Sequence, residues 1–248
     1  MALSKVWGIG KTVRNATKFS KLIFLFIPLF GFLSVTMGVV SFYGQYTGDM
    51  SVAIDQFSDS SIRISEDPTF AESRTVLRYP GMSFVNQASY EGVMAFHYQN
   101  VIQTPGYYLP DVKDKDREVI AFTFYLKNMN EAATINRLNY KILFLETSKH
   151  IEEHLRIMVV VDNVADVYEY QSYRIPGVQS LSFASRQVAV DGNIFQLKAQ
   201  NTVKISVILW IDGYLEDYLK SIGKYTEEDL MGGRLKLQMI FSVNEEGS

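Results

Sequence analysis

The sequence predicts a mainly β protein, in which one N-terminal transmembrane helix precedes an antiparallel β-sandwich of the jelly-roll or immunoglobulin-like type. Three observations carry this prediction. No charged residue occurs between Lys21 and Asp49. Several later segments alternate apolar and polar residues with the period of two that strands require. Aromatic residues are abundant (15 Tyr and 16 Phe) and Pro is scarce (6), which favours strands joined by short turns.

The uncharged segment has the length of a membrane span. It reads LIFLFIPLFGFLSVTMGVVSF from Leu22 to Phe42, and about 20 apolar residues cross the hydrocarbon core of a bilayer as a helix. The first 21 residues contain five basic residues and no acidic one. By the positive-inside bias, this flank stays in the cytoplasm and residues 44–248 lie outside the cell. We assign the span to residues 22–43, including Leu22, Phe26, Pro28, Phe32 and Val40.

A cleaved signal peptide is the alternative interpretation of this segment. The apolar region of a signal peptide has about 7–15 residues and is followed by a small-x-small cleavage site. Here the apolar run is longer, and only Gly38 and Ser41 offer small residues near its end. We therefore favour a retained single-pass anchor in the cell membrane, with the bilayer as a partner. Whether the segment is cleaved stays open.

The composition after the span suits one exported domain. Of all residues, 47% are hydrophobic, which is enough for a core in about 200 residues. The basic flank holds five of the positive charges, so residues 44–248 carry a net charge near −8. This charge argues against nucleic acid as a partner. The chain has no Cys, so the domain depends on core packing alone, as is common on bacterial surfaces.

Alternating segments predict the strands, in order along the chain. Residues 57–100 show no clear pattern, and residues 103–117 read as a loop. A short polar segment, Thr147–Leu155, predicts two helical turns with Ser148 as the N-cap. Tyr214–Glu228 is the one longer helix or ordered insertion that we expect. The expected strands are 50–56, 122–126, 138–144, 156–161, 203–211 and 235–243. Strands with one apolar face and no long helices between them predict antiparallel sheets packed face to face.

The predicted core comes from the apolar faces of these strands. Trp210 lies on the opposite face of its strand from Leu209, and Ile208 shares the face of Trp210. We therefore expect both faces of this strand to be covered, which places it in the centre of its sheet. The predicted core residues are Phe122, Phe124, Leu209, Trp210, Leu237 and Phe241.

One short motif matches a catalytic pattern. His150-Ile151-Glu152-Glu153-His154 satisfies H-x-x-E-H, in which two imidazoles bind zinc and a Glu, here Glu153, acts as the general base. Glu227 or Glu228 is a possible third ligand. The segment is short and polar and precedes a strand, which favours ordinary solvated side chains. We predict no enzyme, no metal and no cofactor, and keep a zinc peptidase as an alternative.

The remaining candidates are weaker. His97 lies between two aromatic residues in a segment read as a strand, where a half-buried and hydrogen-bonded histidine is expected more often than a metal ligand. The aspartates of residues 111–117 alternate with Lys and Arg, which neutralise a possible calcium site. Exposed aromatic residues within Tyr90–Tyr108 or Tyr168–Tyr173 offer flat rings for a ligand such as a carbohydrate. An anchored ligand-binding module is therefore a second alternative.

Three segments resemble the TasA/camelysin family of bacterial surface and biofilm-matrix proteins. Gly38–Gly44 leading to Met50–Ile54 is similar to the hydrophobic segment and first strand of that family. Phe122–Asn128 is similar to an aromatic strand that ends in a polar turn, and Gly232–Ser242 resembles the closing strand. The strand end Trp210–Gly213 also looks like a feature of membrane-anchored bacterial relatives.

The resemblance implies a structural function. In that family, subunits join when an N-terminal strand is donated to the sheet of the next subunit, a form of β-augmentation. The matching segment here is Tyr46–Gln56, with Met50, Val52 and Ile54 as the side chains donated. We therefore expect a membrane-anchored extracellular protein for surface or matrix assembly, with other copies or other surface proteins as partners.

Overall fold

The computed structural model describes residues 48–55, 61–82, 87–108, 118–170, 179–213, 230 and 232–243. The chain divides into two units, Met1–Tyr46 and Thr47–Ser248, and all described residues belong to the second. None of the helices in these ranges is long and apolar enough to span a bilayer. The predicted span at residues 22–43 and the predicted helix at Tyr214–Glu228 lie outside the described residues.

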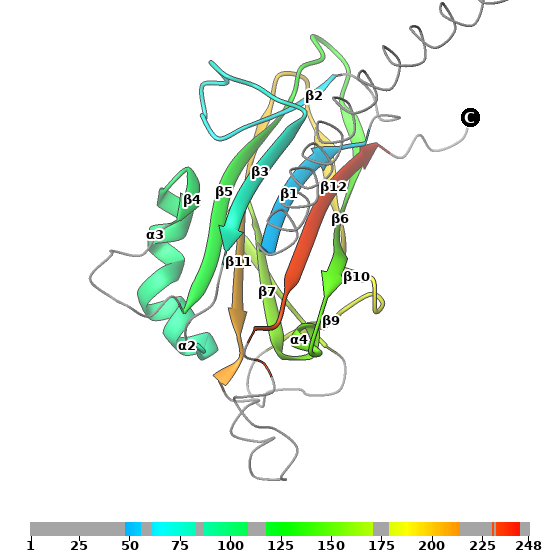
Figure 1. The fold of residues 1–248 in the computed structure, drawn as a ribbon. Helices are drawn as coiled ribbons and strands as arrows, with labels where there is room; N and C mark the ends of the chain where they lie inside the picture. The colour runs from blue at the N-terminus through cyan, green and yellow to red at the C-terminus, as the bar shows by residue number, and fades with distance from the viewer. Residues whose placement is uncertain are drawn as a thin grey trace, which may run out of the picture. The chain divides into compact units, whose positions relative to one another are not determined.

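The domain is mainly β, and its first sheet has five strands in the order β10-β6-β12-β1-β3 (Figure 1). Strand β1, the first of the domain, runs parallel to β12 and antiparallel to β3. The last strand, β12, therefore lies beside the first. The strands of this sheet are β1 (Gly48–Ile54), β3 (Val76–Met82), β6 (Ile135–Thr147), β10 (Val188–Leu197) and β12 (Leu235–Val243).

The second sheet has the order β2-β5-β11-β7-β8-β9, and β4 also pairs with β5. Its strands are β2 (Ile62–Ser65), β4 (Gly106–Tyr108), β5 (Val119–Asn128), β7 (Leu155–Val161), β8 (Val164–Glu169), β9 (Leu181–Ser182) and β11 (Thr202–Ile211). Strands β8 and β9 are parallel. The prediction of purely antiparallel sheets was thus wrong for the pairs β1–β12 and β8–β9. Alternation assigns a residue to a face of a sheet, but it does not specify the direction of the neighbouring strand.

The two sheets pack against one hydrophobic core. Tyr79 of β3 stacks on Phe122 of β5 with ring centroids 4.7 Å apart. Phe124 of β5 meets Phe241 of β12 edge to face at 6.0 Å. These two contacts join side chains from different sheets, so the inner faces are in direct contact. The six residues predicted for the core are all buried: Phe122, Phe124, Leu209, Trp210, Leu237 and Phe241.

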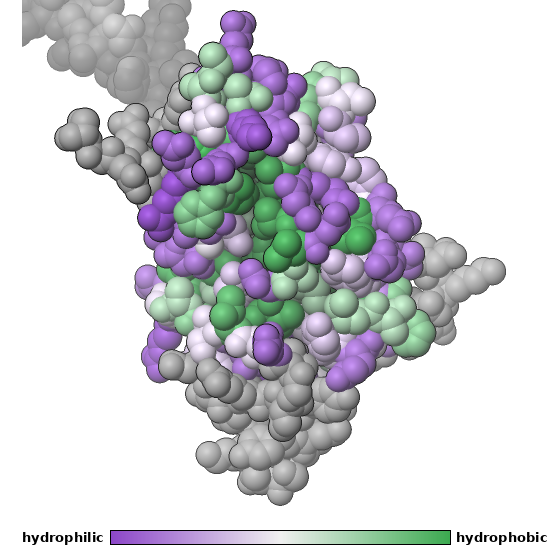
Figure 2. Space-filling model, turned by 180° about the vertical axis from the view of Figure 1, so that it is seen from behind, coloured by the Kyte–Doolittle hydropathy of each residue, from purple (hydrophilic) through white to green (hydrophobic). Residues whose placement is uncertain are grey.

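A second hydrophobic cluster lies on the other face of the second sheet. It contains Trp210 and Ile208 of β11 together with Val93 and Val101. The latter two come from consecutive helical turns, α2 (Tyr90–Gly92), the π-helical η1 (Val93–His97) and α3 (Tyr98–Gln103). Strand β11 lies between β5 and β7, the central position that the sequence predicts for it. From behind, hydrophobic side chains are still visible among hydrophilic ones (Figure 2).

Two local predictions were wrong. The segment after β6 forms a single helical turn, α4 (Ile151–His154), because β6 extends to Thr147. Ser148 does not cap this turn; its hydroxyl accepts a hydrogen bond from the backbone N–H of Arg234 at 2.8 Å. The residues around His97 are helical rather than extended. In both places, contacts with distant parts of the chain prevail over the local pattern.

A glycine allows the edge strand β10 to pack tightly. Gly192 lies opposite Tyr140 of β6, and a Cβ atom at Gly192 would be 2.2 Å from Cζ of Tyr140. The absence of a side chain lets the tyrosine ring lie against the backbone of β10. Burial, together with the neighbouring hydroxyl of Tyr168 on β8, raises the pKa of the Tyr140 hydroxyl. This ring therefore links the edge of one sheet to the other sheet.

We expect Gly192→Ala to lower the free energy of unfolding by about 1–3 kcal/mol, because the added methyl group overlaps the ring of Tyr140. Urea unfolding of the folded domain measures the change. Tyr140→Ala should lower the free energy of unfolding by less in the Gly192→Ala background than in the original chain. In that background the substitution also removes the overlap between the added methyl group and the ring. Gly213→Ala is the matched control, since its Cβ would have only ordinary contacts, at 3.7 Å or more. Equal losses at the two glycines would contradict this account.

Candidate functional site

The first candidate is β1, the strand predicted to be donated. It is an interior strand, with Val52 opposite Met239 of β12 on one side and Leu77 of β3 on the other. Met50 and Val52 are fully buried and Ile54 is nearly so, at 9% exposure. In this structure the strand thus completes the sheet of its own chain.

Strand β1 fills a slot between two strands that do not otherwise pair with each other. Its end is fixed on both sides, since Ile54 N–H donates to the carbonyl of Thr75 at 3.0 Å and Asp55 N–H donates to the carbonyl of Phe241 at 2.8 Å. Without β1, the facing edges of β12 and β3 would lose their hydrogen-bond partners, and apolar side chains of the core would be uncovered. The slot therefore requires an extended strand with apolar residues at alternate positions.

The H-x-x-E-H motif is divided between two environments. His150 precedes α4 in a left-handed conformation (φ 55°), and its side chain is 79% exposed, with Nδ1 3.5 Å from a carboxylate oxygen of Glu153. His154 is buried at 7% exposure. The four-residue turn thus does not place both imidazoles on one helix face. No group of three or more His, Cys, Asp or Glu that could hold a metal occurs among the residues described, and Glu227 lies outside them.

His154 is held neutral by its surroundings. Burial lowers its pKa from the ordinary value of 6.5, and the nearby guanidinium of Arg156 lowers it further, whereas Glu152 acts in the opposite direction. Its backbone carbonyl accepts a hydrogen bond from the N–H of Asp212 at 3.0 Å. The residue therefore joins the end of β11 to the start of β7, and it does so as an uncharged imidazole at pH 7.

A buried charge cluster lies beside His154. Nη2 of Arg156 is 3.2 Å from Oε2 of Glu169 and 2.8 Å from Oδ2 of Asp212. The side chains are 1%, 3% and 0% exposed, respectively. The register explains their meeting, because Arg156 of β7 is opposite Glu169 of β8 and Trp210 of β11, and Asp212 follows Trp210 on the same face.

The cluster holds strand ends together. It joins β7, β8 and β11 at the point where Gly213 N–H donates to the carbonyl of Ala88 and Ala88 N–H donates to the carbonyl of Ile211, both at 3.0 Å. These bonds attach the chain just before α2 to the sheet. Sequence reasoning missed the cluster, although one signal for it exists. Arg156 opens the run RIMVVV, and a charge on a strand covered on both faces needs a buried partner.

Most of the other predicted candidates pack inward or lie outside the described residues, and Phe96 is the exception. His97 is 12% exposed, with Nε2 3.4 Å from Oε2 of Glu118. Tyr108 and Tyr168 are buried, so neither is a free platform for a ligand. Phe96, at 72% exposure, is the large aromatic residue of α2, η1 and α3 that faces solvent. The aspartates of residues 111–117 lie outside the described ranges.

Comparisons with protein families, with curated proteins and with solved structures find no match to this chain.

The neutral state of buried His154 should make folding pH-dependent. As the pH falls below about 6.5 the unfolded chain gains a proton at this histidine, whereas the folded chain, with its lowered pKa, does not. Stability should therefore fall with decreasing pH, and His154→Gln should reduce this slope. Urea unfolding between pH 5 and 7 measures it. The matched control, His150→Gln at the exposed imidazole, should retain the slope; identical profiles for the original chain and His154→Gln would disprove the assignment.

Removing one member of the charge cluster should lower the free energy of unfolding of the domain. Arg156→Met leaves two buried carboxylates without their cation and is expected to destabilise the domain by about 3–5 kcal/mol. Substituting all three residues with apolar ones (Arg156→Met, Glu169→Leu and Asp212→Leu) should cost less than Arg156→Met alone, because no buried charge then remains. Urea unfolding of both variants provides the comparison. A triple variant less stable than the single one would show that the cluster contributes net stability through its ion pairs.

Proposed function

We propose that this chain is a membrane-anchored extracellular structural protein of the TasA/camelysin type, and that its copies assemble by exchanging strand β1. The uncharged segment Leu22–Phe42 and the basic residues before it support the anchor and the orientation. Strand β1 begins shortly after that segment, at Gly48. We take the two packed sheets as a β-sandwich of the jelly-roll or immunoglobulin-like type, to which β1 is added.

The observation that carries the proposal is the connectivity of β1. Its parallel neighbour β12 is at the other end of the chain, and its antiparallel neighbour β3 is reached only after β2, which belongs to the other sheet. No hairpin therefore ties β1 to either neighbour. Apart from β1–β12 and β8–β9, all strand pairs of the described residues are antiparallel, so β1 is an insertion into an antiparallel sheet.

Only backbone hydrogen bonds to its neighbours and buried side chains hold β1 in place. Such a strand can be supplied by another copy of the chain. The contacts of Met50, Val52 and Ile54 would be the same in either case, because the slot is formed by β12 and β3 alone. The remaining cost is that of bringing two chains together, which is reduced when both are anchored in one membrane. Exchange of an identical element is a common low-cost route to assembly. With β1 donated onward from copy to copy, the product is a chain of subunits.

Strand exchange can be trapped with disulfides, because the chain has no Cys of its own. Ser51 of β1 lies opposite Arg78 of β3 on the outer face, and facing Cα atoms of antiparallel strands are about 4.5–5.5 Å apart, within the range that a disulfide spans. Mixed membranes carrying Ser51→Cys in one copy and Arg78→Cys in another should give a covalent dimer on mild oxidation.

The matched control pairs Ser51→Cys with Lys141→Cys. Lys141 is on β6, which is separated from β1 by β12, so no dimer should form with or without exchange. A single chain with both Ser51→Cys and Arg78→Cys reports the intramolecular arrangement. If that chain closes its disulfide internally and the mixed sample yields no dimer above the control, β1 is not exchanged and the proposal fails.

A further inference from the structure

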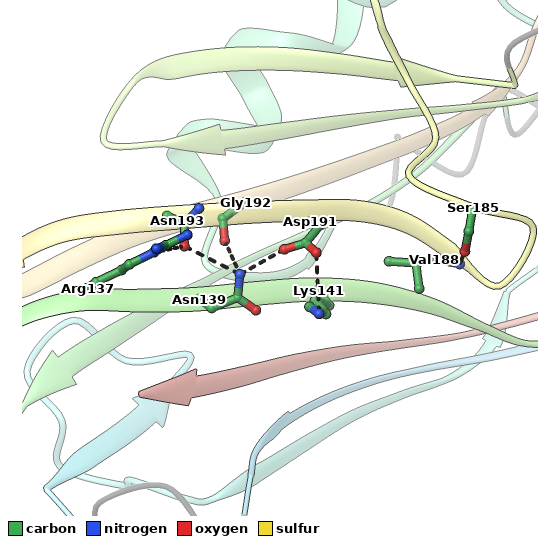
Figure 3. A network of polar contacts seen from close by, with 8 residues as sticks. All are labelled: Arg137, Asn139, Lys141, Ser185, Val188, Asp191, Gly192 and Asn193. Atoms are coloured by element: carbon green, nitrogen blue, oxygen red, sulfur yellow. Dashed lines mark hydrogen bonds and ion pairs between the residues drawn. The ribbon is translucent and has the colours of Figure 1, made fainter. Parts of the chain in front are cut away.

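A ladder of polar side chains crosses the outer face of the first sheet at its β10 edge (Figure 3). Each rung joins β10 to β6. The rungs are Phe195 opposite Arg137, Asn193 opposite Asn139, and Asp191 opposite Lys141.

Hydrogen bonds within the ladder fix its side chains. Nε of Arg137 donates to Oδ1 of Asn193 at 2.8 Å. Nδ2 of Asn139 donates to Oδ1 of Asp191 at 2.8 Å and to the backbone carbonyl of Gly192 at 3.0 Å. Nζ of Lys141 is 3.3 Å from Oδ2 of Asp191. The polar side chains of the ladder are thereby oriented before any ligand arrives, which reduces the entropy lost on binding.

The ladder also leaves hydrogen-bonding capacity directed outward. The bond from Nε orients the guanidinium of Arg137, whose two terminal nitrogens have no hydrogen-bond partner within the described part of the chain. Nδ2 of Asn193 likewise donates to none of the described residues. A guanidinium with two available N–H groups in one plane matches a carboxylate bidentately.

An aromatic ring lies at the end of the ladder. Phe195 is 67% exposed, although it lies within β10 and shares a rung with Arg137. The next residue, Gln196, has φ of 53°, a left-handed conformation that is unfavourable for a residue other than Gly, Asn or Asp. Such strained positions occur often at ligand sites. The exposed ring, the planar amides and the guanidinium thus lie on neighbouring rungs of one sheet face.

The charge of the ladder points to an anionic ligand. Arg137 and Lys141 outnumber Asp191, so the ladder carries a net positive charge, whereas residues 44–248 have a net charge near −8. A ring-shaped ligand with one apolar face, hydroxyl groups and a carboxylate fits all three features: the phenyl ring, the amides and the guanidinium. We propose that the outer face of β6 and β10 binds a glycan of uronic acid residues. One pyranose stacks on Phe195, its carboxylate pairs with Arg137, and its hydroxyls bond to Asn193 and Asp191.

This site does not depend on the exchange of β1. Strand β12 separates β6 from β1, and none of the ladder residues pairs with β1 or β3. The domain would present the same surface whether β1 comes from its own chain or from another copy. The two proposals can therefore fail separately.

The test is isothermal titration of the full chain, purified in lipid nanodiscs, with a soluble oligogalacturonate. Two ligand controls are its methyl ester, which keeps the rings but not the charge, and a neutral glucan oligomer. We expect the oligogalacturonate to bind, and the methyl ester to bind at least about tenfold more weakly, as expected for loss of a bidentate ion pair. The neutral glucan should bind more weakly still, or not at all.

Three variants locate the site. Arg137→Gln and Phe195→Ser should each weaken binding by about tenfold or more, and Arg137→Lys, which keeps the charge but lacks the planar fork, should also weaken it. Arg78→Gln is the matched control, since Arg78 is an exposed arginine on the outer face of β3, the opposite edge strand. It should bind as the original chain does. Urea unfolding of each variant checks the fold. If Arg137→Gln is unstable, the binding of Phe195→Ser still tests the site, because Phe195 is exposed and its replacement should not disturb the core.

Several outcomes overturn the proposal. An equal loss in Arg78→Gln would show attraction by general charge rather than a site. The absence of binding at millimolar oligogalacturonate, or unchanged binding in Phe195→Ser, would also reject it. The chain in nanodiscs could instead form dimers that Phe195→Ser abolishes. That result would show that a second copy of the chain, and not a glycan, binds the outer face at the β10 edge.

Discussion

The structure depends on strand β11 being covered on both faces. Leu209 faces the core between the sheets, and Trp210 faces the cluster beneath α2, η1 and α3. In a chain without Cys, no disulfide can fix the sheets, so apolar burial on both sides of β5, β11 and β7 must do so. The helical turns are therefore part of the core of the domain, because they keep the outer apolar face of the second sheet from water.

Because both faces of β11 and its neighbours are covered, charged side chains at the ends of these strands are buried as well. Arg156 and Glu169 occupy the outer face, as Trp210 does, and they become inaccessible once that face is covered. Ion pairs at such a site rarely add net stability over apolar residues, but they favour one register, since a shifted strand would leave a charge without its partner. The register of β7 against β8 and β11 sets the position of His154 and of the chain before α2.

The sequence predicts the strands with regular alternation, and the misses have physical causes. The limits of β11 and β12 match the alternating runs almost residue for residue. The sequence did not predict β10, because Asp191, Gly192 and Asn193 are residues typical of a turn. In the structure, the missing side chain of Gly192 leaves room for the ring of Tyr140. Asp191 and Asn193 form hydrogen bonds of the polar ladder. The parallel direction of β1, the contact of Arg156 with Asp212 and the ladder all join segments far apart in sequence, which no local pattern predicts.

The pairing of β1 with β12 has a consequence for the synthesis of the chain. The slot for β1 does not exist until β12 has emerged, because Val52 pairs with Met239, nearly the whole domain later. At about 5–20 residues per second, this leaves β1 without its partner β12 for on the order of ten seconds or more. Pairing of distant segments is also slow to nucleate. During this interval the nascent chain exposes an apolar strand, which a chaperone or a copy that has already folded can bind.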